Sequence, residues 1–135
     1  MTRLDPEFLE VEDIFELHAD SIERYGGSVG IRDRGLIESA VAVPRQSFGG
    51  EYLHATIFEM AAAYAFHLAE NQAFVDGNKR VGLAAATAFL DMNGYDLIER
   101  DDRLYTAIMA LSAKTLDKAG LARVFEECSQ IRPDE

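Results

Sequence analysis

The residues best suited to catalysis or ligand binding lie together in the stretch QAFVDGNKR, at positions 72–80. Asp76 is followed by Gly77 and Asn78, and then by two adjacent cations, Lys79 and Arg80. A carboxylate, a glycine turn and paired cations are the groups that together bind phosphate oxygens and a magnesium ion. This stretch therefore predicts a site for a polyphosphate bridged by a metal.

The predicted site depends on the helix that begins at the motif. The apolar spacing predicts a helix over residues 77–93. The first turn of a helix leaves backbone N–H groups unpaired at the positive end of its dipole, so an anion binds favourably there. Gly77 would let a phosphate approach the main chain closely, because it has no side chain in the way.

The motif side chains have separate roles in this prediction. Asn78 can orient a substrate oxygen, Lys79 contributes a point charge, and Arg80 can hold two oxygens at once. Because Asp76 would repel a bare phosphate, we expect a magnesium ion that bridges its carboxylate to the phosphate oxygens. The chemistry that such a site serves is transfer from a nucleotide such as ATP.

An ordinary turn with solvated cations is the alternative, because short motifs often match by chance. Two neighbouring features favour the phosphate site. The motif leads directly into the most apolar segment, VGLAAATAFL, and Phe74 precedes Asp76 by two residues, where it would anchor the loop in the core.

Composition limits the wider possibilities. A chain of 135 residues with 48 % hydrophobic content suits a single domain over residues 1–135. The one cysteine excludes an intrachain disulfide and agrees with a reducing cytoplasm. A net charge of −11 argues against nucleic-acid binding. The least polar run has ten residues, about half of a bilayer span, so we expect no membrane segment.

The apolar periodicity predicts an all-α fold with five or six helices. We expect helices over residues 11–25, from Asp33 as a plausible N-cap to Pro44, over 55–70 and 77–93, and two more in the C-terminal third. The helix over 77–93 is apolar on nearly every side and should be the central, buried one. Residues 45–54 contain two glycines and suggest a flap loop or short hairpin, and Leu97 and Ile98 favour an extended segment.

Three histidines need separate interpretations. His18 and His67 lie in apolar helical stretches, which favours structural core residues over catalytic ones. His54 lies in the irregular segment and is the one that could face a cleft.

AFVDGNKR, followed by AFLDMNGY, resembles the Fic/Doc superfamily, and in particular the death-on-curing (Doc) toxins of bacterial toxin–antitoxin pairs. YGGSVGIRDRGLIESAVAVP, residues 25–44, resembles their N-terminal signature, and the segment between the two motifs is also similar. The resemblance covers residues 8–126 in order. It implies a compact helical Fic/Doc-like domain that transfers an adenylyl or phosphoryl group from ATP or a related nucleotide, with Mg²⁺, to a protein hydroxyl.

The resemblance also implies partners and roles. Doc toxins are kinase-like enzymes that act on elongation factor Tu, which makes that protein a candidate target. The segment over residues 48–54 would be the flap that aligns the target by strand pairing. Phe74 would anchor the loop and Asp76 would hold the magnesium. The anion hole would consist of Gly77, Asn78, Lys79 and Arg80.

The sequence departs from the family pattern at two positions. Gln72 stands where the family has its catalytic histidine, and Ala73 replaces the following proline. An amide cannot take a proton from the target hydroxyl, and a general base contributes about 10²–10⁴-fold. Positioning and charge neutralisation dominate phosphoryl transfer, so we expect a weakened transferase with Gln72, Lys79 and Arg80 at the reacting centre. Whether Gln72 is a natural divergence or an introduced change is open.

Two alternatives stay open beside the transferase. One is a silenced member of the fold that binds nucleotide or antitoxin without transfer, and the other is a helical interaction module without a nucleotide site. Many Fic proteins carry an inhibitory helix with Ser or Thr four residues before Glu-Gly or Glu-Asn. Here Glu70-Asn71 is preceded by Phe66 at that position. We therefore expect control in trans, by an antitoxin whose disordered tail folds into a groove.

Overall fold

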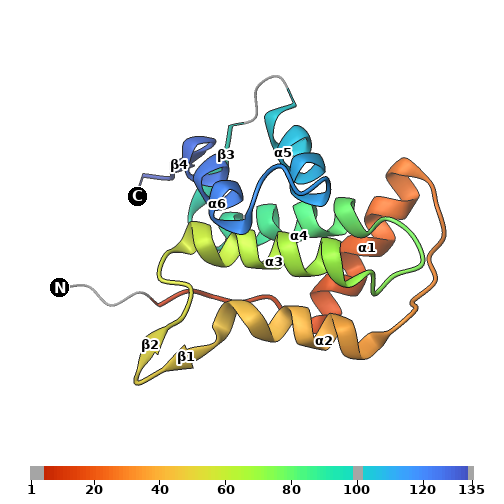
Figure 1. Cartoon of the computed structure of the whole chain (residues 1–135), viewed down its shortest axis with the longest axis horizontal. Coiled ribbons are helices and arrows are strands. Elements are labelled where there is room, and N and C mark those ends of the chain that lie inside the picture. The colour runs from red at the N-terminus through yellow and green to blue at the C-terminus, as the bar shows by residue number, and fades with distance from the viewer. Residues whose placement is uncertain (1–4, 99–101, 134–135) are drawn as a thin grey trace.

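The computed structural model describes residues 5–98 and 102–133. Within these residues it contains six α-helices, one short 3₁₀ helix and two small antiparallel sheets, which confirms the mostly helical fold (Figure 1). The helices are α1 (Val11–Tyr25), α2 (Arg34–Ala42), η1 (Val43–Arg45), α3 (Ile57–Asn71), α4 (Asn78–Met92), α5 (Arg103–Ser112) and α6 (Lys118–Glu127). The strands are β1 (Ser47–Phe48), β2 (Glu51–Tyr52), β3 (Tyr95–Leu97) and β4 (Ser129–Ile131).

Helices α3 and α4 form the centre of the molecule, where they lie side by side in Figure 1. Their close approach depends on small residues. A Cβ atom at Gly82 would lie 2.8 Å from the carbonyl oxygen of Ala65, so no larger residue fits there without a shift of the helices. All six helices contribute buried side chains to one hydrophobic core. A single domain over residues 1–135 stays a prediction, because that range includes residues outside the described part.

The predicted burial of α4 on nearly every side holds for only part of its surface. Val81, Ala85 and Phe89 are fully buried, whereas Thr87 is exposed and Leu83 is half-buried. The outer face has small apolar residues that line a cleft instead of packing against another helix. Helix α3 is the more deeply buried member of the central pair.

The helix N-termini differ in how their backbone donors are satisfied. Asp33 caps α2, Thr56 caps α3 and Asp117 caps α6, each by a side-chain oxygen that accepts a backbone N–H. Helix α4 has Gly77 as its N-cap, which provides no side-chain bond. The N-terminus of α4 is therefore open to an external acceptor.

Strands β1 and β2 form the predicted hairpin, with Phe48 paired to Glu51. Gly49 and Gly50 connect them at φ 61° and 84°, which a two-residue turn with both φ values positive requires. The hairpin leads into the N-terminus of α3, and the motif loop follows the C-terminus. Because α3 has 15 residues, these two features are separated by about 22 Å along the helix. Figure 1 shows them at opposite ends of α3.

Residues near the C-terminus close the molecule on the side of α4. Leu97 lies in β3 as predicted, whereas Ile98 follows the strand; β3 pairs with β4 in antiparallel register. Arg132 forms ion pairs with Asp91 and Asp96, at 3.1 and 3.3 Å. Along the described stretches, no helix is both long and apolar enough to cross a bilayer.

Candidate phosphate-binding site

The motif occupies the loop between α3 and α4, and the segment before α2 holds this loop in place. The carbonyl oxygen of Ala73 accepts hydrogen bonds from the N–H groups of Arg32 and Asp33, at 2.8 and 3.0 Å. The N–H of Val75 donates to the carbonyl oxygen of Gly30 at 2.9 Å. Backbone pairing therefore fixes the path of the loop, and side-chain patterns in the sequence did not reveal this pairing.

Phe74 lies in the core, where an anchor of the loop would lie. It is 1 % exposed, and its ring stacks on that of His18 with the centroids 3.7 Å apart. His18 Nε2 also lies 2.8 Å from the carbonyl oxygen of Asp76. His18 is 2 % exposed, in agreement with the structural role predicted for it. Through these two contacts, His18 connects α1 to the loop at Phe74 and at Asp76.

The Asn78 side chain points into the protein and closes the loop. Its Oδ1 accepts from the N–H of Phe74 at 3.1 Å, and its Nδ2 donates to the carbonyl oxygen of Phe74 at 3.0 Å. Only 7 % of Asn78 is exposed. In this conformation the side chain orders the loop. It is therefore not free to orient a substrate oxygen, which is the role that the sequence had suggested for it. Its backbone N–H is left for that purpose.

The first turn of α4 presents a set of unpaired backbone donors. The N–H of Val81 bonds to the carbonyl oxygen of Gly77 at 3.0 Å, which starts the helical pattern. Within the described residues, the N–H groups of Asn78, Lys79 and Arg80 have no acceptor. Such a turn attracts an anion both by its free donors and by the helix dipole.

Asp76 lies beside this turn with an exposed carboxylate. Oδ1 accepts from the N–H of Gly77 at 3.0 Å, and Oδ2 from the N–H of Ser28 at 3.3 Å. Each oxygen keeps a lone pair for a further ligand. Among the residues that the structure describes, no cluster of three His, Cys, Asp or Glu could hold a metal. A magnesium ion here would take its other ligands from phosphate and water, which is usual for Mg²⁺, so Asp76 fits the predicted role.

The two cations of the motif differ in their surroundings. Arg80 is exposed, and its guanidinium lies 4.0 Å from the ring centroid of Tyr25 and 5.7 Å from that of Tyr105. Lys79 is half-buried. Within residues 5–98 and 102–133, neither cation has a carboxylate within 4.0 Å. Both charges are thus available to an external anion.

Arg80 also lines a cleft of about 1030 Å³ between α1, α4, β3 and α5. The walls are apolar where α4 contributes Leu83 and Ala84. The other acidic and basic residues on the walls are Asp20, Arg24, Asp91, Asp96 and Asp102. Arg80 is the one residue of the motif on this wall, so it connects the open end of α4 with the cleft.

Gln72 is exposed at the C-terminal end of α3, with a left-handed φ of 55°. Its Nε2 donates to the carbonyl oxygen of Ala69 at 2.9 Å, and its Oε1 accepts from Asn78 Nδ2 at 3.5 Å. The side chain therefore folds back onto the end of α3 and contains no group that can take a proton at neutral pH.

The other two histidines lie outside the motif loop. His54 lies three residues before the start of α3, at the end of that helix away from Gln72. His67 is half-buried on α3, and its Nε2 lies 3.0 Å from Nζ of Lys118. Among the described residues, no hydrogen bond or ring contact joins either histidine to the motif, so His54 does not replace the missing base in this structure.

Comparisons with known proteins show the family of this chain. The sequence model of the Fic/DOC family matches residues 8–90, which include the motif. A protein of Mycolicibacterium smegmatis named Toxin Doc is 44 % identical over 91 residues, which cover 67 % of this chain and 68 % of that protein. A protein of Escherichia phage P1 named Protein kinase doc is 33 % identical over 88 residues, which cover 65 % of this chain and 69 % of that protein.

Proposed function

This chain belongs to the Fic/DOC family, and on that premise we propose that it is the Doc-like toxin of a toxin–antitoxin pair. Its activity would be the transfer of a phosphoryl or nucleotidyl group from ATP or a related nucleotide to a protein hydroxyl. The open N-terminus of α4 carries this proposal, because an exposed carboxylate meets three N–H groups and a lysine that have no partner within the described part of the chain. The name of the phage relative, a protein kinase, favours phosphoryl transfer.

The residues of the motif would divide the work of binding. The N–H groups of the first turn and Lys79 hold phosphate oxygens, and Asp76 holds Mg²⁺, which neutralises the charge on the transferred group. Arg80 extends from the same turn into the cleft, where it can contact a second set of oxygens. His18 holds the backbone of Asp76 through its carbonyl oxygen, and the stacked ring of Phe74 holds His18.

The hairpin suggests how an acceptor protein would be aligned. An extended segment that pairs with β1 or β2 must reach the open end of α4, about 22 Å away. At about 3.3 Å per extended residue, roughly seven residues would separate the paired segment from the modified hydroxyl. We take elongation factor Tu as the candidate acceptor.

Control in trans by an antitoxin is part of the proposal. The cleft beside Arg80 has room for a folded segment, and its volume of about 1030 Å³ exceeds that of most single-ligand sites. An antitoxin segment in this cleft would cover Arg80 and so weaken nucleotide binding.

A silenced member that binds nucleotide without transfer is the second candidate. The observation in its favour is that both ends of the Gln72 amide are hydrogen-bonded within the protein, so it is not poised toward an acceptor. On this alternative, the N-terminus of α4 would still bind a nucleotide and magnesium.

The proposal is tested by comparison of the chain with its Gln72→His variant. Each is incubated with ATP labelled separately on the α- or γ-phosphate, Mg²⁺ and elongation factor Tu, and the transferred label is counted. We expect slow transfer by the chain and faster transfer by the histidine form, by about 10²–10⁴-fold. Label from the histidine form alone would indicate the silenced member. If neither transfers label while both bind nucleotide, the proposed acceptor is wrong.

A further inference from the structure

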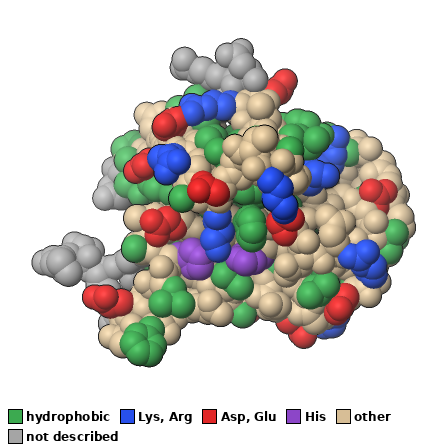
Figure 2. All heavy atoms as spheres, viewed as in Figure 1, with side chains coloured by type: hydrophobic (Ala, Val, Ile, Leu, Met, Phe, Trp, Pro, Cys, Tyr) green, Lys and Arg blue, Asp and Glu red, His purple; other side chains and the backbone are tan. Residues whose placement is uncertain are grey.

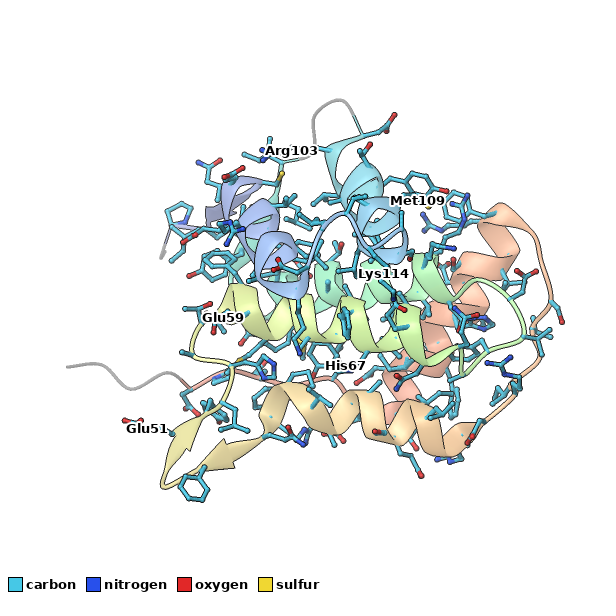
Figure 3. All side chains as sticks on the ribbon, viewed as in Figure 1. Glu51, Glu59, His67, Arg103, Met109 and Lys114 are labelled. Carbon is cyan, nitrogen blue, oxygen red and sulfur yellow. The ribbon has the colours of Figure 1, made fainter. Side chains whose placement is uncertain are left out.

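A second cleft, of about 650 Å³, lies between α3, the connection from α5 to α6, and α6. It shares no lining residue with the cleft beside Arg80. Its walls consist of Phe66, Leu111, Lys114, Thr115, Leu116, Asp117, Lys118 and Arg123. In Figure 3, Lys114 lies between the end of α5 and α3. Apart from Phe66, these residues lie outside residues 8–90, which the family model matches.

The charge of this second cleft opposes that of the whole protein. The chain carries −11, yet three cations and one acid line the cleft. Asp117 Oδ1 caps α6 by accepting from the N–H of Gly120 at 2.7 Å, and its carboxylate keeps its negative charge. Lys114 pairs with Glu70 at 3.4 Å. Among the described residues, Lys118 and Arg123 have no carboxylate within 4.0 Å, so neither is ion-paired, and the cleft residues with Glu70 carry a net charge of +1.

Lys118 is the most constrained of these cations. It is half-buried, and its Nζ lies 3.0 Å from Nε2 of His67. Burial, and then the charge of Lys118, lower the pKa of His67 to about 4, so His67 is neutral at pH 7 and accepts a hydrogen bond from the ammonium. A neutral partner leaves the charge uncompensated, and burial lowers the pKa of Lys118. In the view of Figure 2, two histidine side chains lie next to each other with a basic side chain beside them.

Apart from Thr115, the uncharged residues of the second cleft are apolar. The ring of Phe66 lies 5.4 Å from Nζ of Lys118, and Leu111 and Leu116 contribute further apolar surface. Lys114 follows the C-cap of α5 in the left-handed conformation, at φ 67°, where a glycine would be less strained. The turn thus holds a cation at the rim at some cost in backbone strain.

From this arrangement, we propose that the second cleft binds a small organic anion, namely a phosphate or carboxylate group joined to a compact apolar body. Lys118 and Arg123 would hold the anionic group, and Phe66 with the two leucines would contact the apolar part. A cleft of about 650 Å³ lies within the range of about 300–1,000 Å³ that small-molecule sites occupy.

Phenyl phosphate and benzoate are suitable probes of this second cleft. Each is titrated into the full chain at pH 7, and binding is followed by calorimetry and by the ring signals of His67 in NMR spectra. We expect saturable binding of at least one probe that shifts the His67 signals. Inorganic phosphate and phenol should bind at least tenfold more weakly, because each lacks one half of the proposed ligand.

Three variants assign the binding to a cleft. Lys118→Met and the exposed Arg123→Gln should each weaken the binding that shifts the His67 signals at least tenfold, whereas the control Lys79→Met in the motif should leave that binding unchanged. Circular dichroism confirms that each variant is folded, and Arg123→Gln serves alone if Lys118→Met is not. Unchanged His67 signals, or full affinity in Arg123→Gln, would refute the proposal. Loss of binding in Lys79→Met would assign the probe to the motif instead.

Discussion

Asp76 is the single side chain on which the proposed metal dependence rests. Its carboxylate is exposed at the open end of α4, and two backbone N–H groups fix its orientation. Its carbonyl oxygen is held separately, by His18 at 2.8 Å. The backbone and the carboxylate thus have independent supports, so replacing the carboxylate alone should leave the loop in place.

Asp76→Asn should therefore abolish the magnesium dependence of nucleotide binding, because an amide oxygen is a much weaker ligand of Mg²⁺ than a carboxylate. Binding of ATP is measured by calorimetry with and without Mg²⁺. Glu38→Gln is the matched control. It converts an exposed, ion-paired carboxylate on α2, which has no proposed role at the site, to an amide. If magnesium enhances ATP binding equally in both variants, Asp76 does not hold the metal.

The end of α3 shows how one residue can serve both an element and a site. Gln72 terminates the helix at φ 55°, a conformation that glycine adopts without strain and other residues do not. Its amide covers the end of the helix by a bond to the carbonyl oxygen of Ala69. The sequence allowed a loop to be predicted here, but not the left-handed conformation of this residue.

Gln72→Gly should raise the free energy of unfolding by about 1 kcal/mol, because it removes the strain of the left-handed residue. The bond to Ala69 is lost as well, which reduces the gain. Urea denaturation measures the difference. Gln46→Gly is the control, because Gln46 has φ −60°, where glycine only adds freedom to the unfolded chain. It should lower stability by roughly 0.5–1 kcal/mol. Equal effects of the two substitutions would contradict the argument from backbone strain.

The sequence predicted an element well where the pattern that indicates it lies within that element's own residues. The helices over residues 11–25 and 77–93 were visible in the apolar spacing, Asp33 was visible as a cap, and the paired glycines of the hairpin were visible as a turn. The pairing of the motif loop with Gly30 and Arg32 joins backbone groups more than 40 residues apart. No periodicity reports such contacts, so this support was not predicted.

The candidate site shows the same division between local and distant signals. Residue types and spacing indicated that Phe74 is buried beside the motif, whereas the anion hole stays a prediction. The inward direction of the Asn78 side chain was missed, because an asparagine in a turn reads the same whether it faces a ligand or the loop itself. The stack of Arg80 on Tyr25 and Tyr105 was missed because those residues come from α1 and α5.

On the scale of the whole molecule, four of the five described cations that have no carboxylate within 4.0 Å lie at two places, and the fifth is Arg32. A net charge of −11 repels long polyanions, while Lys79 and Arg80 at one place and Lys118 and Arg123 at the other can attract small anions locally. The second place also makes the stability of the protein sensitive to pH. His67 on α3 faces Lys118 on α6, and His54 also lies close enough to affect it. The pKa of each histidine is lowered first by burial and then by the charge of Lys118.

The sign of this pH dependence follows from the pKa of His67, which falls from 6.5 to about 4 on folding. Between these values the unfolded chain binds more protons than the folded one, so stability is complete above pH 6.5 and decreases as the pH falls toward 4. Urea denaturation of the chain and of His67→Gln at several pH values isolates this contribution from that of the carboxylates, which both proteins share. The chain should lose more stability than the variant over that range, since the glutamine has no proton to gain. Parallel pH profiles would mean that His67 keeps its ordinary pKa in the folded protein, and that neither burial nor the charge of Lys118 lowers it.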